Sequence, residues 1–265
     1  MDRKHLKFGL ILAVLIAAVF WTTSSHALNN SSLKGPYSVL LTSAAGWTPS
    51  NMVGVLNFDG AGNVTGTFQS NIDGTLGSAT ASGTYSVGAG GTGTMTLTLS
   101  TGPVVTYAMA VEASAKQIEM IVSNVAGETA DVIAGSAISQ GVTLPYTFTD
   151  ASLKGTYGLA LSKIPLDQSN GGPSDMAGTL TFDGKGNIKS GAGTQNENGG
   201  VAAFTSTGTY SVNADGTGTI VLDVSGGLVV NFAIALNSDG RGFQLIELTT
   251  NSGGRNDVIG GSASR

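Results

Sequence analysis

Apolar and polar residues alternate with a period of two along most of the chain. In residues 94–99, for example, Met95, Leu97 and Leu99 alternate with threonines. Such alternation predicts strands that bury one face. Between turn-forming residues such as Asp-Gly and Thr-Gly-Pro, the first half of the chain holds eight such segments, near residues 35–42, 52–58, 63–69, 80–87, 93–99, 104–111, 117–123 and 129–137.

The second half of the chain repeats the first at an offset of 120 to 126 residues. Five segments recur in the same order, and Gly-Thr-Tyr-Ser-Val at 83–87 returns unchanged at 208–212. The apolar positions keep the same parity in both copies. We therefore divide the chain into a first repeat over 28–140, a linker over 141–149 and a second repeat over 150–265, each repeat having the size of one domain.

Eight short strands joined by hairpins, each with one apolar face, must bury that face. Curling the meander into a closed barrel does so and also removes the exposed edges. We therefore predict an all-β protein with two tandem eight-stranded antiparallel up-and-down β-barrels. A two-sheet sandwich is the alternative, although it usually needs long crossover connections, of which the sequence shows few.

The N-terminal segment has the order of a secretory signal peptide, which we assign to residues 1–27. A basic start precedes an uncharged, mostly apolar run over residues 8–21, and Ser25 and Ala27 are small residues ahead of a cleavage site. The apolar run is shorter than the roughly 20 residues that span a bilayer. We expect cleavage after Ala27, no stable membrane span, and a secreted, periplasmic or cell-surface protein.

The composition limits the kinds of functional site that the chain can form. Removal of residues 1–27 takes away both histidines, and the chain has no Cys, so disulfides and Cys-ligated metal sites are excluded. Nine Lys or Arg then face sixteen Asp or Glu, a net charge of −7, which argues against nucleic acid as a partner. An enzyme needs a base or nucleophile with a partner, and we find no such motif. We expect a non-enzymatic protein without a cofactor.

Two Asp-Gly-x-Gly-Asn segments, at residues 59–63 and 183–187, invite a calcium-site interpretation through their oxygen atoms. They lack the further carboxylates of an EF-hand loop. Asp-Gly and Gly-Asn also supply the positive φ that hairpin turns require. We interpret both segments as turns and expect no metal.

Glu119 and Glu247 lie among apolar residues on the predicted seventh strand of each repeat. An inward carboxyl group would be a candidate catalytic group. The two glutamates do not align, because matching Asn124 with Asn251 pairs Glu247 with Met120. Since lone carboxylates are rarely buried, we expect both to face the solvent.

Five tyrosines occupy predicted inner faces: Tyr37, Tyr85, Tyr107, Tyr157 and Tyr210. They could contact polar groups of a ligand, or they could fill a core and send their hydroxyl groups to backbone partners. An eight-stranded barrel is wide enough either to be filled by side chains or to hold one small ligand. The sequence leaves both alternatives open.

In an up-and-down barrel, alternate loops lie at the same end. At one end the loops are short and alike in the two repeats, whereas at the other end loops such as 43–50 and 70–78 differ from their counterparts. Variable loops on a rigid frame are where binding usually occurs. Trp47, the one Trp left after cleavage, lies in such a loop, either as a contact for a ligand or partner or as a cap on the core.

The motifs Leu-Lys-Gly-x-Tyr, Phe-Asp-Gly-x-Gly-Asn and Gly-Thr-Tyr-Ser-Val resemble a secreted bacterial family of tandem β-repeats with no settled activity. The likeness covers nearly all of residues 32–263. The family's architecture is similar to that of lipocalins and avidins, and Gly35-x-Tyr37 and Gly155-x-Tyr157 resemble the Gly-x-Trp that starts a lipocalin. The resemblance implies eight-stranded barrels and transfers no ligand residue.

From these features we expect a secreted protein that binds a small ligand or a surface partner through the variable-loop ends of its barrels. The alternative is a structural or adhesive subunit of an extracellular assembly, which the tandem copying and the 40 Gly, 28 Ser and 30 Thr favour. Size-exclusion chromatography across concentrations separates the two, because only the second self-associates into polymers.

Overall fold

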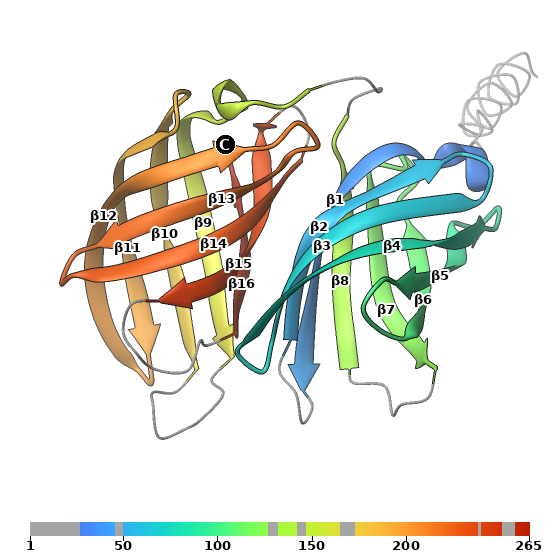
Figure 1. Ribbon diagram of the computed structural model, residues 1–265, viewed down its shortest axis with the longest axis horizontal. Coiled ribbons are helices and arrows are strands. Elements are labelled where there is room, and N and C mark those ends of the chain that lie inside the picture. Colours follow the sequence, from blue (N-terminus) through green and yellow to red (C-terminus); the bar gives the residue numbers. More distant parts are fainter. Residues whose placement is uncertain are drawn as a thin grey trace, which may run out of the picture.

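The computed structural model describes residues 27–45, 50–126, 132–141, 147–164, 173–237, 240–250 and 258–265. These residues form two closed antiparallel β-barrels of eight strands each (Figure 1). The first barrel consists of β1 (Lys34–Ala45), β2 (Ser50–Asp59), β3 (Asn63–Ile72), β4 (Thr75–Val87), β5 (Thr92–Leu99), β6 (Val104–Val111), β7 (Gln117–Val125) and β8 (Val132–Ser139). The second consists of β9 (Lys154–Ile164), β10 (Ser174–Asp183), β11 (Asn187–Glu197), β12 (Gly200–Val212), β13 (Thr217–Val224), β14 (Leu228–Asn237), β15 (Gly242–Thr250) and β16 (Val258–Ser264). Within the described ranges, no helix has the length and the apolar character that crossing a bilayer requires.

Each barrel closes because its first strand pairs with its second and with its last. Val39 of β1 pairs with Gly54 of β2 and with Ala137 of β8, and β9 pairs in the same way with β10 and β16. The other strands pair with their neighbours along the chain. The prediction of two up-and-down barrels is confirmed and the sandwich is excluded. Closure pairs every described strand on both of its sides over at least part of its length.

The β3–β4 and β11–β12 hairpins extend further than the alternation suggested. Their tips are two-residue turns with positive φ at both positions, at Asp73 (49°) and Gly74 (75°) and at Asn198 (51°) and Gly199 (82°). Asp-Gly and Asn-Gly are the pairs that type I′ hairpin turns favour. The prediction of a variable loop over 70–78 is therefore wrong, because most of that segment is strand.

One end of each barrel is closed by a short 3₁₀ turn and a group of aromatic rings. The turns η1 (Asn30–Ser32) and η2 (Asp150–Ser152) directly precede the first strand of each barrel. At the closed end of the second barrel, the Phe182 ring packs edge-on against the rings of Tyr157, Tyr210 and Phe243. The distances between ring centroids are 5.3, 5.0 and 5.7 Å, in that order. In the first barrel, the Phe58 ring packs edge-on against two tyrosine rings in the same way. Side chains therefore seal this end of both barrels.

Phe148 packs with the second barrel, although the sequence assigns it to the linker over 141–149. Its ring is buried in the core of that barrel, and its N–H donates to the carbonyl oxygen of Ala214 at 3.1 Å. Leu28 packs against the core of the first barrel in the corresponding place. A hydrophobic residue ahead of each 3₁₀ turn thus helps to close each barrel.

The two barrels lie side by side and touch through the outer faces of β1–β3 and β14–β16 (Figure 1). A separate apolar cluster, which we call the barrel interface, fills this contact; its buried members are Val53, Val55, Ala233, Ala235 and Ile246. Hydrogen bonds flank it: Gln140 Nε2 donates to the carbonyl oxygen of Leu236 at 2.8 Å, and Asn71 Nδ2 to that of Glu247 at 3.1 Å. The outer faces of these strands are therefore a second buried surface.

Candidate ligand-binding cavity

Two sequence-based candidates lie outside the described residues. Trp47 falls in the gap between residues 45 and 50, and most of the assigned signal peptide precedes residue 27. The role of Trp47 as a contact and the cleavage after Ala27 stay predictions.

Four of the five candidate tyrosines lie at the closed ends of the barrels and bond to the backbone. The hydroxyl of Tyr210 lies 2.8 Å from the carbonyl oxygens of both Asp150 and Leu153. The other three also donate to backbone carbonyl groups, namely Tyr37, Tyr85 and Tyr157. These four side chains join the barrel wall to the segments that seal it, as expected of the core-filling alternative. Their role as ligand contacts is untested.

Tyr107 is the fifth, and it lies inside the first barrel, buried among core residues. The register places it opposite Met95, just as Phe232 lies opposite Ile220 in the second barrel. Since phenylalanine serves at the equivalent position, the frame does not require a hydroxyl group there. Burial raises the pKa of Tyr107 to about 12, and burial is also the main cause that raises the pKa of Tyr37 to about 12. Both phenols therefore stay neutral at physiological pH.

The two Asp-Gly-x-Gly-Asn segments are hairpin turns, as interpreted from the sequence. Asp59 Oδ1 accepts from the backbone N–H groups of Ala61 (2.7 Å) and Asn63 (2.9 Å), and Asp59 Oδ2 accepts from Asn63 Nδ2 (2.6 Å). The side chain of Asn63 is the main cause that lowers the pKa of Asp59 to about 2. Asp183 makes the same three bonds in the second barrel. The carboxylates of Asp59 and Asp183 therefore each accept hydrogen bonds from donors within their own turn.

Removal of divalent cations is accordingly expected to leave the protein's stability unchanged. Differential scanning calorimetry with and without an excess of EDTA should give melting temperatures within about 2 °C of each other, because a metal bound only to the native state would stabilise it. Added calcium chloride is the matching control. A fall of about 10 °C or more on chelation would contradict the assignment of these segments as turns.

Glu247 faces the interior of the second barrel, so the prediction that it is solvated is wrong. It is 1% exposed and pairs with Phe232, as Val122 pairs with Tyr107 in the first barrel. Its structural counterpart is thus Val122, not Met120. Glu247 follows Phe243 and Leu245 at a spacing of two residues, and all three side chains point into the barrel. This alternation sets the orientation of Glu247 although buried carboxylates are generally rare. Glu119 lies on the outer face and is exposed, as predicted.

Glu247 lines a cavity of about 380 Å³ inside the second barrel. All eight strands of the barrel contribute to its wall, which places it within the barrel. Its lining consists of Leu159, Leu161, Lys163, Ser174, Met176, Leu180, Gln195, Glu197, Phe204, Leu222, Val224, Leu228, Val230, Phe232, Glu247 and Ile259. Most of these side chains are apolar, which is typical of a site for a small ligand.

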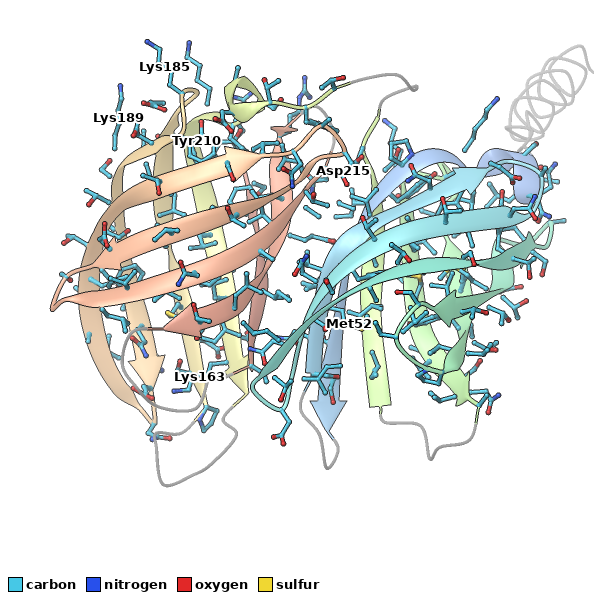
Figure 2. All side chains as sticks on the ribbon, viewed as in Figure 1. Met52, Lys163, Lys185, Lys189, Tyr210 and Asp215 are labelled. Atoms are coloured by element: carbon cyan, nitrogen blue, oxygen red, sulfur yellow. The ribbon has the colours of Figure 1, made fainter. Side chains whose placement is uncertain are left out.

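The cavity reaches the surface at the end opposite the aromatic rings. Lys163 and Tyr210 mark the two ends of the barrel (Figure 2). The side chain of Glu197 lines the cavity and is 38% exposed, and its Oε1 lies 3.0 Å from Lys163 Nζ. Ser174 pairs with both Lys163 and Glu197 on the neighbouring strands. The mouth therefore carries polar groups, and it lies at the variable-loop end.

An exchange of one aromatic ring between neighbouring strands distinguishes the two barrel interiors. In the first barrel, Phe68 of β3 pairs with Ala79 of β4 and is buried in the core. In the second, Gly193 takes the place of Phe68, and its partner Phe204 takes the place of Ala79. A Cβ atom at Gly193 would lie 2.5 Å from Phe204 Cζ, so this ring rests against the glycine and lines the cavity.

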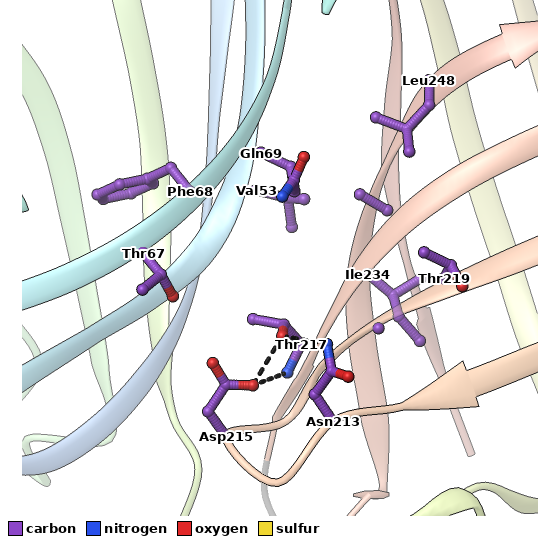
Figure 3. A pocket seen from close by; sticks show the side chains of 12 residues that line it. Val53, Thr67, Phe68, Gln69, Asn213, Asp215, Thr217, Thr219, Ile234 and Leu248 are labelled. Carbon is purple, nitrogen blue, oxygen red and sulfur yellow. Dashed lines mark hydrogen bonds between the residues drawn. The ribbon is translucent and has the colours of Figure 1, made fainter. Parts of the chain in front are cut away.

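A smaller hollow of about 240 Å³ lies between the barrels (Figure 3). Val53 and Gln69 line it from the first barrel, and the β12–β13 turn with Asp215 lines it from the second. Asp215 Oδ1 already accepts from the N–H (3.0 Å) and the hydroxyl (2.7 Å) of Thr217. Asp215 is also the one charged residue among the described residues of this wall. We regard this hollow as a packing gap and place the candidate site in the barrel.

Comparison with known proteins gives no family for this chain but does find a similar solved structure. No protein-family model matches the chain, and no curated protein sequence does. A crystal structure of a protein of unknown function from the DUF3598 family of Nostoc punctiforme is similar over 92% of this chain and 99% of that chain, with 10% sequence identity and a TM-score of 0.28. The fold class is established by the strand pairing of this chain itself.

Proposed function

We propose that this protein is a secreted, non-enzymatic binding protein that holds one small, largely apolar ligand inside its second barrel. The observation that carries the proposal is the cavity of about 380 Å³, walled by all eight strands and reaching the surface at Glu197. Burial of apolar ligand surface against Leu, Val, Met and Phe side chains would supply the affinity. The few polar groups at the mouth would orient the ligand.

The first barrel has a different role in this proposal. Its interior holds the Phe68 ring where the second barrel has Gly193, and its outer face supplies Val53 and Val55 to the barrel interface. We propose that it supports the strands β14 and β15 from outside. Glu247 and Phe232, which line the cavity, lie on those two strands.

The proposal is tested with the neutral fluorescent probe N-phenyl-1-naphthylamine, whose emission rises in apolar surroundings. We expect saturable binding to the purified protein with one site per chain. Substitution Leu222→Phe adds bulk to the cavity wall and should weaken binding about tenfold or more, which corresponds to about 1.4 kcal/mol. The matched control is Val221→Phe, since Val221 is the next residue of β13 and faces outward; it should change the affinity less than about twofold.

Two results would contradict the proposal. One is no saturable probe binding to the wild-type protein. The other is equal loss of binding in Leu222→Phe and Val221→Phe, which would place the probe outside the barrel.

A further inference from the structure

The first barrel repeats the apolar face that the second barrel presents at the barrel interface. Ile121 pairs with Ala108 as Ile246 pairs with Ala233. Ile246 is 0% exposed in the barrel interface, whereas Ile121 is 57% exposed. We call the outer face of β6 and β7 the first outward face; its apolar residues are Ala108, Ala110 and Ile121, the equivalents of Ala233, Ala235 and Ile246.

The second barrel repeats the opposite side of the same contact on the outer face of β10 and β11, which we call the second outward face. Ala177 and Thr179 occupy the positions of Val53 and Val55, since β10 and β11 pair in the same register as β2 and β3. Both are exposed, and Ala177 lines an open hollow of about 580 Å³. The two outward faces lie on the sides of the barrels that point away from each other (Figure 1). A head-to-tail contact between two copies of the chain would therefore repeat the barrel interface.

Two neutral amide side chains are buried next to the apolar cluster of the barrel interface. Asn51 is 1% exposed and Gln244 is 2% exposed. Gln244 Nε2 donates to Ser136 Oγ of the other barrel at 3.4 Å, and a Cβ atom at Gly260 would lie 2.8 Å from Asn51 Nδ2. Both amides thus meet the opposite barrel directly.

Carboxylates replace both amides on the outward faces. Asp175 is the equivalent of Asn51, because each lies two residues ahead of the first residue of its face, Ala177 or Val53. Glu119 is the equivalent of Gln244, because each lies two residues ahead of the isoleucine. Both carboxylates are exposed in the single chain.

A contact that repeated the barrel interface would bury both carboxylates without a counter-charge. The residues that the amides meet, Ser136 and Gly260, correspond by strand pairing to Ser262 and Ala134. Neither of these equivalents carries a positive charge. Burial of an unpaired carboxylate is costly, and two of them in one contact also repel each other.

We propose that the two outward faces fit a second copy of this chain and that Glu119 and Asp175 keep the copies apart. The contact joins different faces of the two copies, so without the carboxylates it would continue from chain to chain into an open filament. With them, the protein stays a monomer of two barrels. This inference goes beyond the proposed function and does not depend on the ligand.

The test is sedimentation equilibrium of the purified protein and two variants at concentrations up to about 1 mM. The apolar variant, Ala177→Val with Thr179→Val, restores the valines of the barrel interface. The restored variant adds Glu119→Gln and Asp175→Asn. We expect the wild-type protein and the apolar variant to be monomers and the restored variant to self-associate at least about tenfold more tightly, because two buried like charges change binding by that order.

Two controls locate the effect. Ile121→Lys in the restored variant should return it to the monomer, because it places a charge at the centre of the contact. Asp73→Asn with Asp223→Asn makes the same change of net charge at two other exposed positions. Added to the apolar variant, this pair should leave it a monomer.

The reverse exchange tests the same carboxylates within one chain. Asn51→Asp with Gln244→Glu places them in the barrel interface, where they should drive the two barrels apart. Small-angle X-ray scattering should then give a larger radius of gyration than that of the wild-type protein, with unchanged β-type circular dichroism. This measurement decides the matter if the restored variant does not fold.

Four results would overturn the inference. They are self-association of the wild-type protein, a restored variant that stays a monomer, equal association in the charge control, and an unchanged radius of gyration in the reverse exchange. The first of these would favour the structural subunit of an extracellular assembly. Probe binding in the second barrel is measured separately, so the proposed function stands or fails independently.

Discussion

Substitution of Phe182 by alanine is expected to lower the free energy of unfolding of the second barrel by about 3–5 kcal/mol, the range found for buried aromatic truncations. Phe182 is 2% exposed, and its ring packs edge-on against three other rings at the closed end. Removing it leaves a void bounded by rigid aromatic side chains that cannot easily collapse. Urea unfolding of the wild-type and variant proteins, followed by circular dichroism, measures the difference.

Phe204→Ala is the matched control, because it makes the same change in the same barrel. Phe204 is only partly buried and already borders the cavity, so its truncation opens little additional void. We expect a loss of about 1–2 kcal/mol for this variant, mainly from the lost apolar burial. Equal losses for the two variants would show that the aromatic rings do not seal the barrel as described.

The second large effect concerns the barrel interface. Residues 28–140 and 141–265, produced separately, are expected to fold and then to bind each other, because each carries a complete set of eight strands and one side of the apolar contact. Substitution Ile246→Lys should weaken this association by about 100-fold or more, as expected for a charge placed in the centre of an apolar interface. Analytical ultracentrifugation of the mixed pieces measures it. The second piece starts at residue 141 because Phe148 packs in its core.

Val201→Lys provides the control for that experiment. Val201 is 70% exposed on β12, so a lysine there should change the association less than about twofold. Loss of β-type circular dichroism in both separate pieces would contradict the division into two domains. Equal weakening by the two lysine variants would contradict the assigned interface.

Glu247 shows where inference from the sequence failed. Matching Asn124 with Asn251 misaligned the seventh strands by two residues. The strand pairing puts Thr249 in the place of Asn124, because Asn124 pairs with Thr106 and Thr249 pairs with Asn231. The bulge that follows is common to both barrels, so the error came from the choice of Asn251 as the matching residue. The inward position of Glu247 was nevertheless readable from its alternation with Leu245 and Phe243.

The amino-acid sequence by itself determined the strands and their order, and it favoured closed barrels over a sandwich. Alternation with a period of two shows which residues share a face, and Gly-rich turns show where the chain reverses. These are local properties, since a few consecutive residues determine each strand and each hairpin turn. The Asp-Gly-x-Gly-Asn turns were predictable for the same reason.

Only the tertiary structure decided which barrel is hollow and which outer face is buried. The first barrel has the pair Phe68 and Ala79 where the second barrel has Gly193 and Phe204. Whether such a ring fills the barrel interior depends on the side chains that face it from the other strands. Alternation likewise assigns Val53 and Ile246 to the outer face but cannot tell whether water or another barrel covers them. Both outcomes arise from contacts between residues distant in the chain, where the volume and the burial of one side chain depend on its neighbours in space.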